Sequence, residues 1–175
     1  MNIYPGSFYF ISQKFFTDFP DPHLVKNKKQ TYNQPHNRPC CCAFYDVSNN
    51  LYWMVPISSQ VDKYTAIYKH KIAKNGRCDT FVFGNVLGYR KAFLIQNMFP
   101  VAPRYILNRY VDKNYGTPIS IPKDLKKELA QKSIKILTLY RQGKRWLIFP
   151  DVQYLEECLC QQVVYEHINE CEMSV

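Results

Sequence analysis

The chain has few acidic residues and few glycines, and both shortages limit the chemistry that it can perform. Its 175 residues include only 14 Asp and Glu against 23 Lys and Arg, and only six Gly. Two-metal nucleases need clustered carboxylates to hold their cations, and the acids before residue 150 are few and scattered, which disfavours that mechanism. The scattered glycines provide neither a Walker-type phosphate loop nor a dinucleotide-binding fingerprint.

Long apolar runs, secretion signals and paired metal-binding cysteines are also missing. No stretch approaches the roughly 20 apolar residues that span a bilayer, and the N-terminal sequence has neither a basic start nor a cleavage site. We therefore expect a cytoplasmic protein without a membrane partner. The seven Cys include no CxxC pair, so we expect no metal site and no cofactor. The run Cys40 to Cys42 is expected to supply small buried hydrophobes.

Charge is distributed very unevenly along the chain. The net charge is +9, yet residues 151–175 contain six acids and no Lys or Arg, so residues 1–150 carry +15. An excess this large on one small body predicts a polyanionic partner, and nucleic acid is the leading candidate. A basic surface that serves only solubility is the alternative, and membrane binding is disfavoured because no basic amphipathic anchor is present.

Residues 37–60 predict a β-hairpin whose open end carries polar groups. Apolar strand formers lie on both sides of Asn49-Asn50, a pair that can adopt the positive φ of a tight turn. Pro39 and Pro56 should sit at strand ends or edges because they have no backbone donor. Pairing of the two strands would bring Arg38 near Ser58 and Ser59, where one cation and two hydroxyls can hold a phosphodiester.

The remaining elements predict a single α+β domain, residues 1–175. Residues 8–19 indicate a strand that leads into a short helix, and residues 79–86, 92–97 and 104–111 indicate further strands. Leu125, Leu129, Ile136 and Tyr140 recur at helical spacing within residues 122–142, which predicts a long helix with a basic exterior. A short strand at 145–149 and a helix from Val152 to about Ile168 follow. Five or six short strands suffice for a small antiparallel barrel.

Three basic segments are candidates for binding single-stranded nucleic acid, because cations neutralise phosphates and aromatic rings stack on bases. The first is a loop that leads into the hairpin. The second follows the hairpin, and the third is the long helix. An ordinary solvated loop or helix face is the alternative for each. The candidate residues are Lys28, Lys29 and His36 in the loop, Tyr64, Tyr68, Lys69 and Lys71 after the hairpin, and Lys126 and Lys127 in the helix.

A metal-free reaction is available if the substrate is RNA. The 2′-hydroxyl can attack the neighbouring phosphate and leave a 2′,3′-cyclic phosphate and a 5′-hydroxyl, so the protein need only orient groups, stabilise charge and move protons. Arg38 and Lys63 could neutralise the transition state. Tyr32, Ser58 and Ser59 could donate hydrogen bonds or relay a proton.

The order of several short motifs resembles a known family. These are the FYFIS start, Thr31-Tyr32 before NRP, the strand pair ending in PISS, the LIQNMFPV segment and the long basic helix. In this order they resemble the toxins of type III toxin-antitoxin systems, the ToxN, AbiQ and CptN family, and CptN most of all. The Arg-Pro strand and the PISS strand also resemble MazF and PemK toxins, which share an SH3-like barrel.

The resemblance implies a sequence-selective, metal-independent endoribonuclease that acts on cellular or phage RNA. It implies an α+β fold with a small SH3-like, MazF/PemK-type antiparallel β-barrel, a short N-terminal helix, the long basic helix and a C-terminal helix. It also implies inhibition by a small repeated pseudoknot RNA antitoxin within a closed toxin-RNA hetero-oligomer. By the same resemblance Tyr32, Arg38, Ser58 and Ser59 match the family's site, and Lys63 is the nearest match to its lysine. A noncatalytic RNA-binding module is the alternative function.

Overall fold

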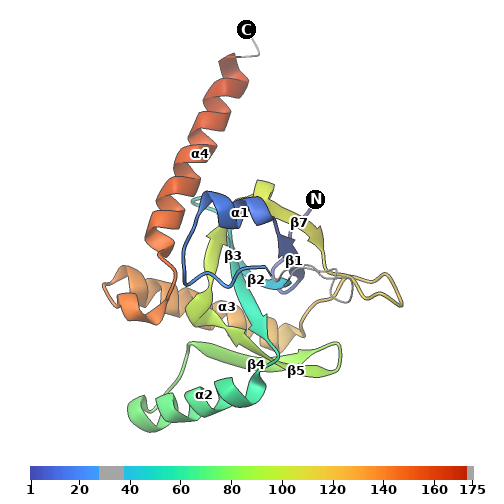
Figure 1. Ribbon diagram of the computed structural model, residues 1–175, viewed down its shortest axis with the longest axis vertical. Helices are drawn as coiled ribbons and strands as arrows, with labels where there is room; N and C mark the ends of the chain where they lie inside the picture. The colour runs from blue at the N-terminus through green and yellow to red at the C-terminus, as the bar shows by residue number, and fades with distance from the viewer. Residues whose placement is uncertain (28–37, 173–175) are drawn as a thin grey trace.

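The computed structural model describes residues 1–27 and 38–172, with side chains described as far as Gln162. Within these ranges the chain forms one mixed α+β body (Figure 1). The elements in chain order are β1 (Phe8–Ile11), α1 (Gln13–Asp18), β2 (Cys40–Asp46), β3 (Leu51–Ser58), α2 (Val61–Asn75), β4 (Phe81–Val86), β5 (Tyr89–Leu94), η1 (Ile95–Asn97), β6 (Phe99–Val101), η2 (Pro103–Tyr105), β7 (Ile106–Arg109), α3 (Lys123–Arg141), η3 (Arg145–Leu147) and α4 (Val152–Glu172), where η marks a 3-10 helix.

The predicted hairpin of β2 and β3 is confirmed and forms the centre of the sheet. Cys40 pairs with Pro56 and Asp46 pairs with Leu51, with a bulge between Cys42 and Phe44. Asn50 adopts a φ of 54° in the turn, a left-handed conformation that asparagine tolerates better than most residues. The hairpin therefore has the predicted turn at one end and Arg38 and Ser58 at the other.

The sheet is open, which corrects the expected barrel. Its strand order is β4-β5-β3-β2-β1-β7, and β6 pairs with β3, all antiparallel. Strand β3 pairs with two different strands on the side away from β2. Tyr52 to Met54 pair with β6, whereas Ile57 and Ser58 pair with β5. Among the described strands, β4 and β7 end the path without pairing to each other. The SH3-like, MazF/PemK-type classification stays a prediction.

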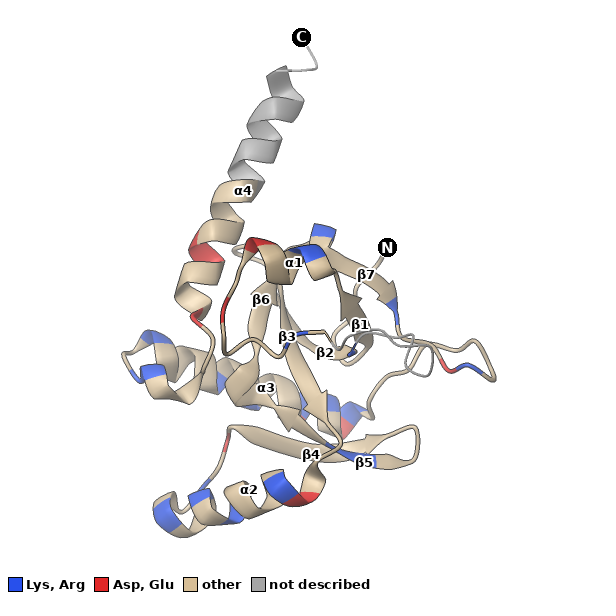
Figure 2. Ribbon diagram, viewed as in Figure 1, with Lys and Arg blue, Asp and Glu red and all other residues tan. Residues whose placement is uncertain are grey.

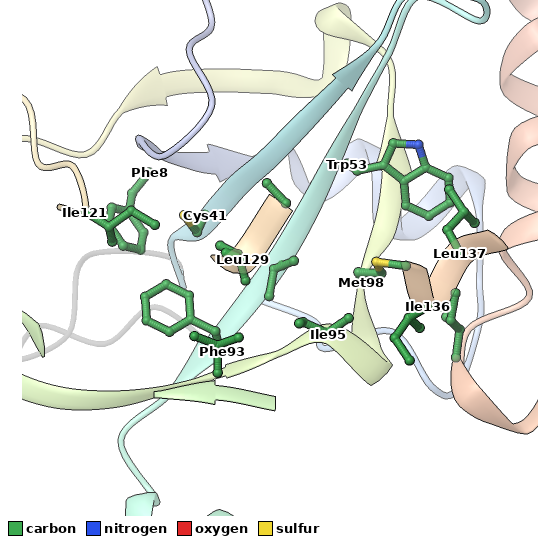
Figure 3. Packing of buried hydrophobic residues seen from close by; sticks show 14 of the residues in the cluster. Phe8, Cys41, Trp53, Phe93, Ile95, Met98, Ile121, Leu129, Ile136 and Leu137 are labelled. Carbon is green, nitrogen blue, oxygen red and sulfur yellow. The ribbon is translucent and has the colours of Figure 1, made fainter. Parts of the chain in front are cut away.

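Helix α3 packs on one face of the open sheet and covers the main hydrophobic core. Its buried side chains Leu129, Ile136 and Leu137 pack against residues from the strands and from the segment after β5 (Figure 3). The opposite face packs against α1 and the start of α4. Because both faces are covered, β2 and β3 are nearly continuous apolar runs, and Cys40, Cys41 and Cys42 are all buried, as predicted.

Some local elements differ from those predicted, including helix α2, which was not among the expected helices, whereas the long helix α3 is confirmed. Residues 145–149 were expected to form a strand, but Arg145–Leu147 is a 3-10 turn in which Leu147 N–H donates to the Lys144 carbonyl. Strand β6 was not predicted, because it is three residues long and contains Pro100. Helix α3 spans nearly the predicted range, with Leu129, Ile136 and Tyr140 buried. No helix in the described part of the chain combines the length and apolar character needed to cross a membrane.

Candidate active site

Strand pairing brings Arg38, Ser58 and Ser59 to one rim of the sheet. Because Cys40 pairs with Pro56, Arg38 and Ser58 each lie two residues beyond a paired position, at the same end of the hairpin. The charge of Arg38 acts on Cys40: burial raises the pKa of that thiol to about 12, and the guanidinium offsets part of this rise. Arg38 and Ser58 are half-buried, and Ser59 is exposed.

Both serine oxygens accept a hydrogen bond from a group that can only donate. Ser58 Oγ accepts from the backbone N–H of Gln60 at 3.1 Å, and Ser59 Oγ accepts from Lys91 Nζ at 2.8 Å. An ammonium and an amide N–H have no acceptor capacity, so neither bond uses the hydroxyl hydrogen. Each serine therefore keeps one O–H donor for a substrate oxygen, and Ser59 holds a cation beside it.

Lys91 is the site residue that sequence reasoning missed. It lies on β5, opposite Gly84 of β4, and the pairing of Ser58 with Ala92 places it next to Ser59. Lys91 and Ser59 are 32 residues apart, and the contact depends on β5 pairing with β3 rather than on any local pattern. Lys91 lies immediately before the strand predicted at 92–97, and the observed strand β5 begins at Tyr89 and so includes it.

Helix α2 begins immediately after the serines and adds its positive end to the rim. Val61 N–H donates to the Ser59 carbonyl at 2.9 Å, and Gln60 is the N-cap residue. The N-terminus of a helix favours anions, although exposed Asp62 in the first turn offsets part of this field. Lys63 is exposed in the same turn, with its Nζ 5.6 Å from the centroid of the Tyr64 ring.

The predicted RNA-binding residues fall into three groups in the structure. Those of the loop before the hairpin, Lys28, Lys29 and His36, lie outside the described residues, as does the predicted catalytic residue Tyr32. On α2, Lys69 is exposed, whereas the rings of Tyr64 and Tyr68 are half-buried against Phe81 and Phe83. Lys71 points inward and donates to Thr80 and Gln96 at 2.9 and 3.0 Å, and burial lowers its pKa. Lys126 and Lys127 are exposed in the first turns of α3.

Helix α3 has free cations at one end and paired cations at the other. In its C-terminal two thirds, Lys132 pairs with Glu128, Lys135 with Asp79 and Arg141 with Glu156. Lys123, Lys126 and Lys127 in its first turns form no ion pair with another described residue. Figure 2 shows the resulting distribution, with blue along α2 and at the start of α3 and red on α4.

The first turns of α3 lie over the hairpin that carries Lys91. Leu125 packs so closely on Gly84 that a Cβ at that glycine would lie 2.2 Å from Leu125 Cδ2. Because Gly84 pairs with Lys91, the free lysines of α3 and the site rim belong to one side of the molecule. Among the described residues, no group of three or more His, Cys, Asp or Glu side chains is arranged to hold a metal ion.

Comparison with solved structures finds a similar fold in a known protein. AbiQ, described as a lactococcal anti-phage endoribonuclease belonging to the type-III toxin-antitoxin system, aligns with a TM-score of 0.63. The alignment covers 92% of this chain and 98% of that chain, at 15% sequence identity. The chain has the AbiQ fold. No protein-family model and no curated protein sequence matches the chain. Similarity to CptN in particular stays a prediction.

Proposed function

We propose that the protein is a sequence-selective, metal-independent endoribonuclease toxin of a type III toxin-antitoxin system, acting in the cytoplasm. The observation that carries the proposal is the hydrogen bond from Lys91 to Ser59, at a rim that also holds Arg38 and Ser58. A cation and free hydroxyl donors at one point suit a phosphodiester that gains negative charge. The AbiQ fold supports the same class of activity.

In the proposed reaction the 2′-oxygen of RNA forms a bond to phosphorus and the bond to the 5′-oxygen breaks. The 2′-hydroxyl loses its proton to a base, and the departing 5′-oxygen gains one, which leaves a 2′,3′-cyclic phosphate and a 5′-hydroxyl. Ser58 and Ser59 donate to the nonbridging oxygens, while Arg38 and Lys91 balance their charge. Lys63 is proposed to add to this charge, and Tyr32 to relay a proton.

The proposed partners are RNA molecules. The cations at the start of α3 and along α2, which have no acidic partner among the described residues, suit a phosphate backbone, so affinity should fall as salt rises. We assign RNA binding to these two basic segments, which include Lys69, Lys126 and Lys127. A small pseudoknot RNA antitoxin would occupy them and hold the toxin in a closed toxin-RNA hetero-oligomer.

The test is cleavage of mixed cellular RNA by purified protein in the presence of EDTA, with the ends of the products mapped. We expect cleavage at a recurring sequence, with 2′,3′-cyclic phosphate and 5′-hydroxyl ends. Activity that disappears with the chelator and returns with Mg²⁺ would contradict the metal-free mechanism. Intact RNA that is nevertheless bound tightly would favour the noncatalytic RNA-binding module.

A further inference from the structure

A cavity of about 330 Å³ lies at the far end of α2 from the serines. Its lining comes from the C-terminal end of α2, the residues before β4, the C-terminal part of α3 and the segment around η3. Ile136, Leu139 and Leu147 give it an apolar wall, and Trp146 beside them is 71% exposed. This volume is within the range of small-ligand pockets, and the exposed indole leaves a large apolar ring in water.

The charges around this cavity favour an anionic occupant. Arg77 and Lys144 line it, are exposed, and form no ion pair with another described residue. Asp79 is the one acid among the described lining residues, and Lys135 neutralises it at 2.6 Å. An apolar wall, an exposed indole and two free cations together match a nucleotide, which has a flat base and a charged phosphate.

Helix α2 connects this cavity to the site rim. Its 15 residues, at 1.5 Å each, span about 22 Å, which equals about six nucleotides of a stacked strand at 3.4 Å each. Lys63, Lys69 and Lys74 are exposed along the helix between its two ends. Figure 2 shows blue segments along α2. A single strand held at Ser59 would therefore meet cations along its path to Trp146.

We infer that the cavity binds one base of a single-stranded RNA, about six nucleotides from the phosphate held at Ser59, with Trp146 stacked on that base. Arg77 and Lys144 contact the flanking phosphates. The choice of RNA as the ligand rests on the proposed function, whereas the cavity, the indole and the cations do not. The site would extend recognition well beyond the cleaved bond and contribute to the selection of the RNA.

The two tryptophans of the chain make this inference directly measurable. Trp53 is fully buried and Trp146 is exposed, so a change of indole fluorescence on adding RNA reports on Trp146. The probe is 2′-O-methyl RNA of random sequence and about ten nucleotides, which has no attacking hydroxyl and is long enough to span both sites. We expect quenching, and about 5- to 100-fold weaker binding for Trp146→Ala, measured by the anisotropy of labelled RNA.

Matched variants and probes separate stacking from general attraction. Trp146→Phe keeps an aromatic face and should retain most of the affinity. Tyr115→Ala removes another exposed aromatic ring, 80% exposed, that does not line the cavity, and should bind like the unmodified protein. RNA of about three nucleotides is too short to reach from Ser59, so Trp146→Ala should not weaken its binding at the rim.

The outcomes for the cavity and for the proposed function are distinct. RNA cleavage with unchanged Trp146 fluorescence and unchanged binding by Trp146→Ala would overturn the cavity assignment and leave an apolar protein segment as the alternative occupant. Quenching by polyphosphate equal to that by RNA would overturn base stacking. Binding of uncleavable RNA that depends on Trp146, without cleavage of natural RNA, would support the cavity and contradict the endoribonuclease.

Discussion

The two faces of the β4–β5 hairpin each hold a lysine ammonium, but the two ammonium groups have different partners. On the face covered by α2, the rings of Tyr64 and Tyr68 pack against Phe81 and Phe83. Lys71 from the same helix donates to Thr80 and Gln96 and lies 5.0 Å from the centroid of the Phe81 ring. These are the contacts of a helix held to a sheet.

The face toward α3 instead holds a cation at the edge of the molecule. Lys91 pairs with Gly84 along the hairpin, and its ammonium donates to the neutral hydroxyl of Ser59. No carboxylate among the described residues balances it. Interleaved Lys and Tyr in a sequence therefore do not distinguish a binding surface from a packing surface. The two kinds of surface are distinguished by the group that each lysine ammonium contacts in the fold.

The largest expected effect comes from breaking the polar rim itself. Ser59→Ala removes the hydroxyl donor and the partner of Lys91, and Arg38→Ala removes a charge beside the same site. Each should lower the rate of RNA cleavage by about 10²- to 10³-fold, as the loss of one oxyanion donor does, and should abolish growth inhibition. Cleavage assays and urea unfolding measure the two properties separately.

The matched control for the rim is Ser120→Ala, which truncates an exposed serine elsewhere. It should leave both cleavage and stability unchanged. Ser59→Ala should also keep its unfolding free energy within about 0.5 kcal/mol, because an exposed hydroxyl contributes little to the fold. Full activity in a folded Ser59→Ala protein would remove this residue from the site.

Substitutions of Lys91 and Lys71 test most directly whether the two faces of the β4–β5 hairpin differ. Lys91→Met should reduce cleavage by about 10- to 150-fold, which corresponds to the roughly 1.5–3 kcal/mol of a charged hydrogen bond, with little loss of stability. Lys71→Met should do the reverse and lower the unfolding free energy by about 1–3 kcal/mol, because Thr80 and Gln96 lose their donor. If Lys71→Met keeps its stability and loses RNA affinity instead, the two faces do not differ as described, and the RNA-binding prediction for Lys71 gains support.

Local patterns predicted the central hairpin and the long helix of this fold. The hairpin followed from two apolar runs around Asn49-Asn50, and α3 followed from the spacing of Leu129, Ile136 and Tyr140. Local patterns failed at residues 145–149 and at α2, and the other failures concern pairing between distant segments. Strand β6 exists because β3 offers an edge to it, and the sheet stays open because α3 fills the core that a closed barrel would have enclosed.

The same distinction applies to the site. The sequence alone predicts that Arg38, Ser58 and Ser59 lie close together, because they belong to one predicted hairpin. It does not predict the position of Lys91, because the contact of Lys91 with Ser59, 32 residues away, requires β5 to pair with β3. Likewise, a single sequence cannot reveal that Tyr64 and Tyr68 face Phe81 and Phe83, since that depends on which side of α2 meets the sheet.

Gly84→Ala tests whether α3 must lie close to the Lys91 face. The added methyl group would collide with Leu125, and crowding of this kind costs about 1–3 kcal/mol of unfolding free energy. The double variant Gly84→Ala with Leu125→Ala should recover part of this loss, and a double-mutant cycle by urea unfolding measures the coupling. Equal stability of Gly84→Ala and the unmodified protein would show that Leu125 moves aside freely.

The smallest expected effect is the pH dependence that Lys71 contributes. Burial lowers its pKa below the ordinary 10.5, so between the folded and unfolded values the unfolded chain binds more protons. The stability contributed by Lys71 should therefore rise as pH increases toward 10.5, because the amine is neutral in the fold and can still donate to Thr80 and Gln96. The measurement is urea unfolding of the unmodified protein and of Lys71→Met at pH 8 and at pH 10.5. The titration of other groups cancels in the difference in unfolding free energy between the two proteins. The stability gap between the two proteins should widen at the higher pH. A gap that narrows would mean that Lys71 is stabilised as a cation, and the α2 face would then resemble the Lys91 face.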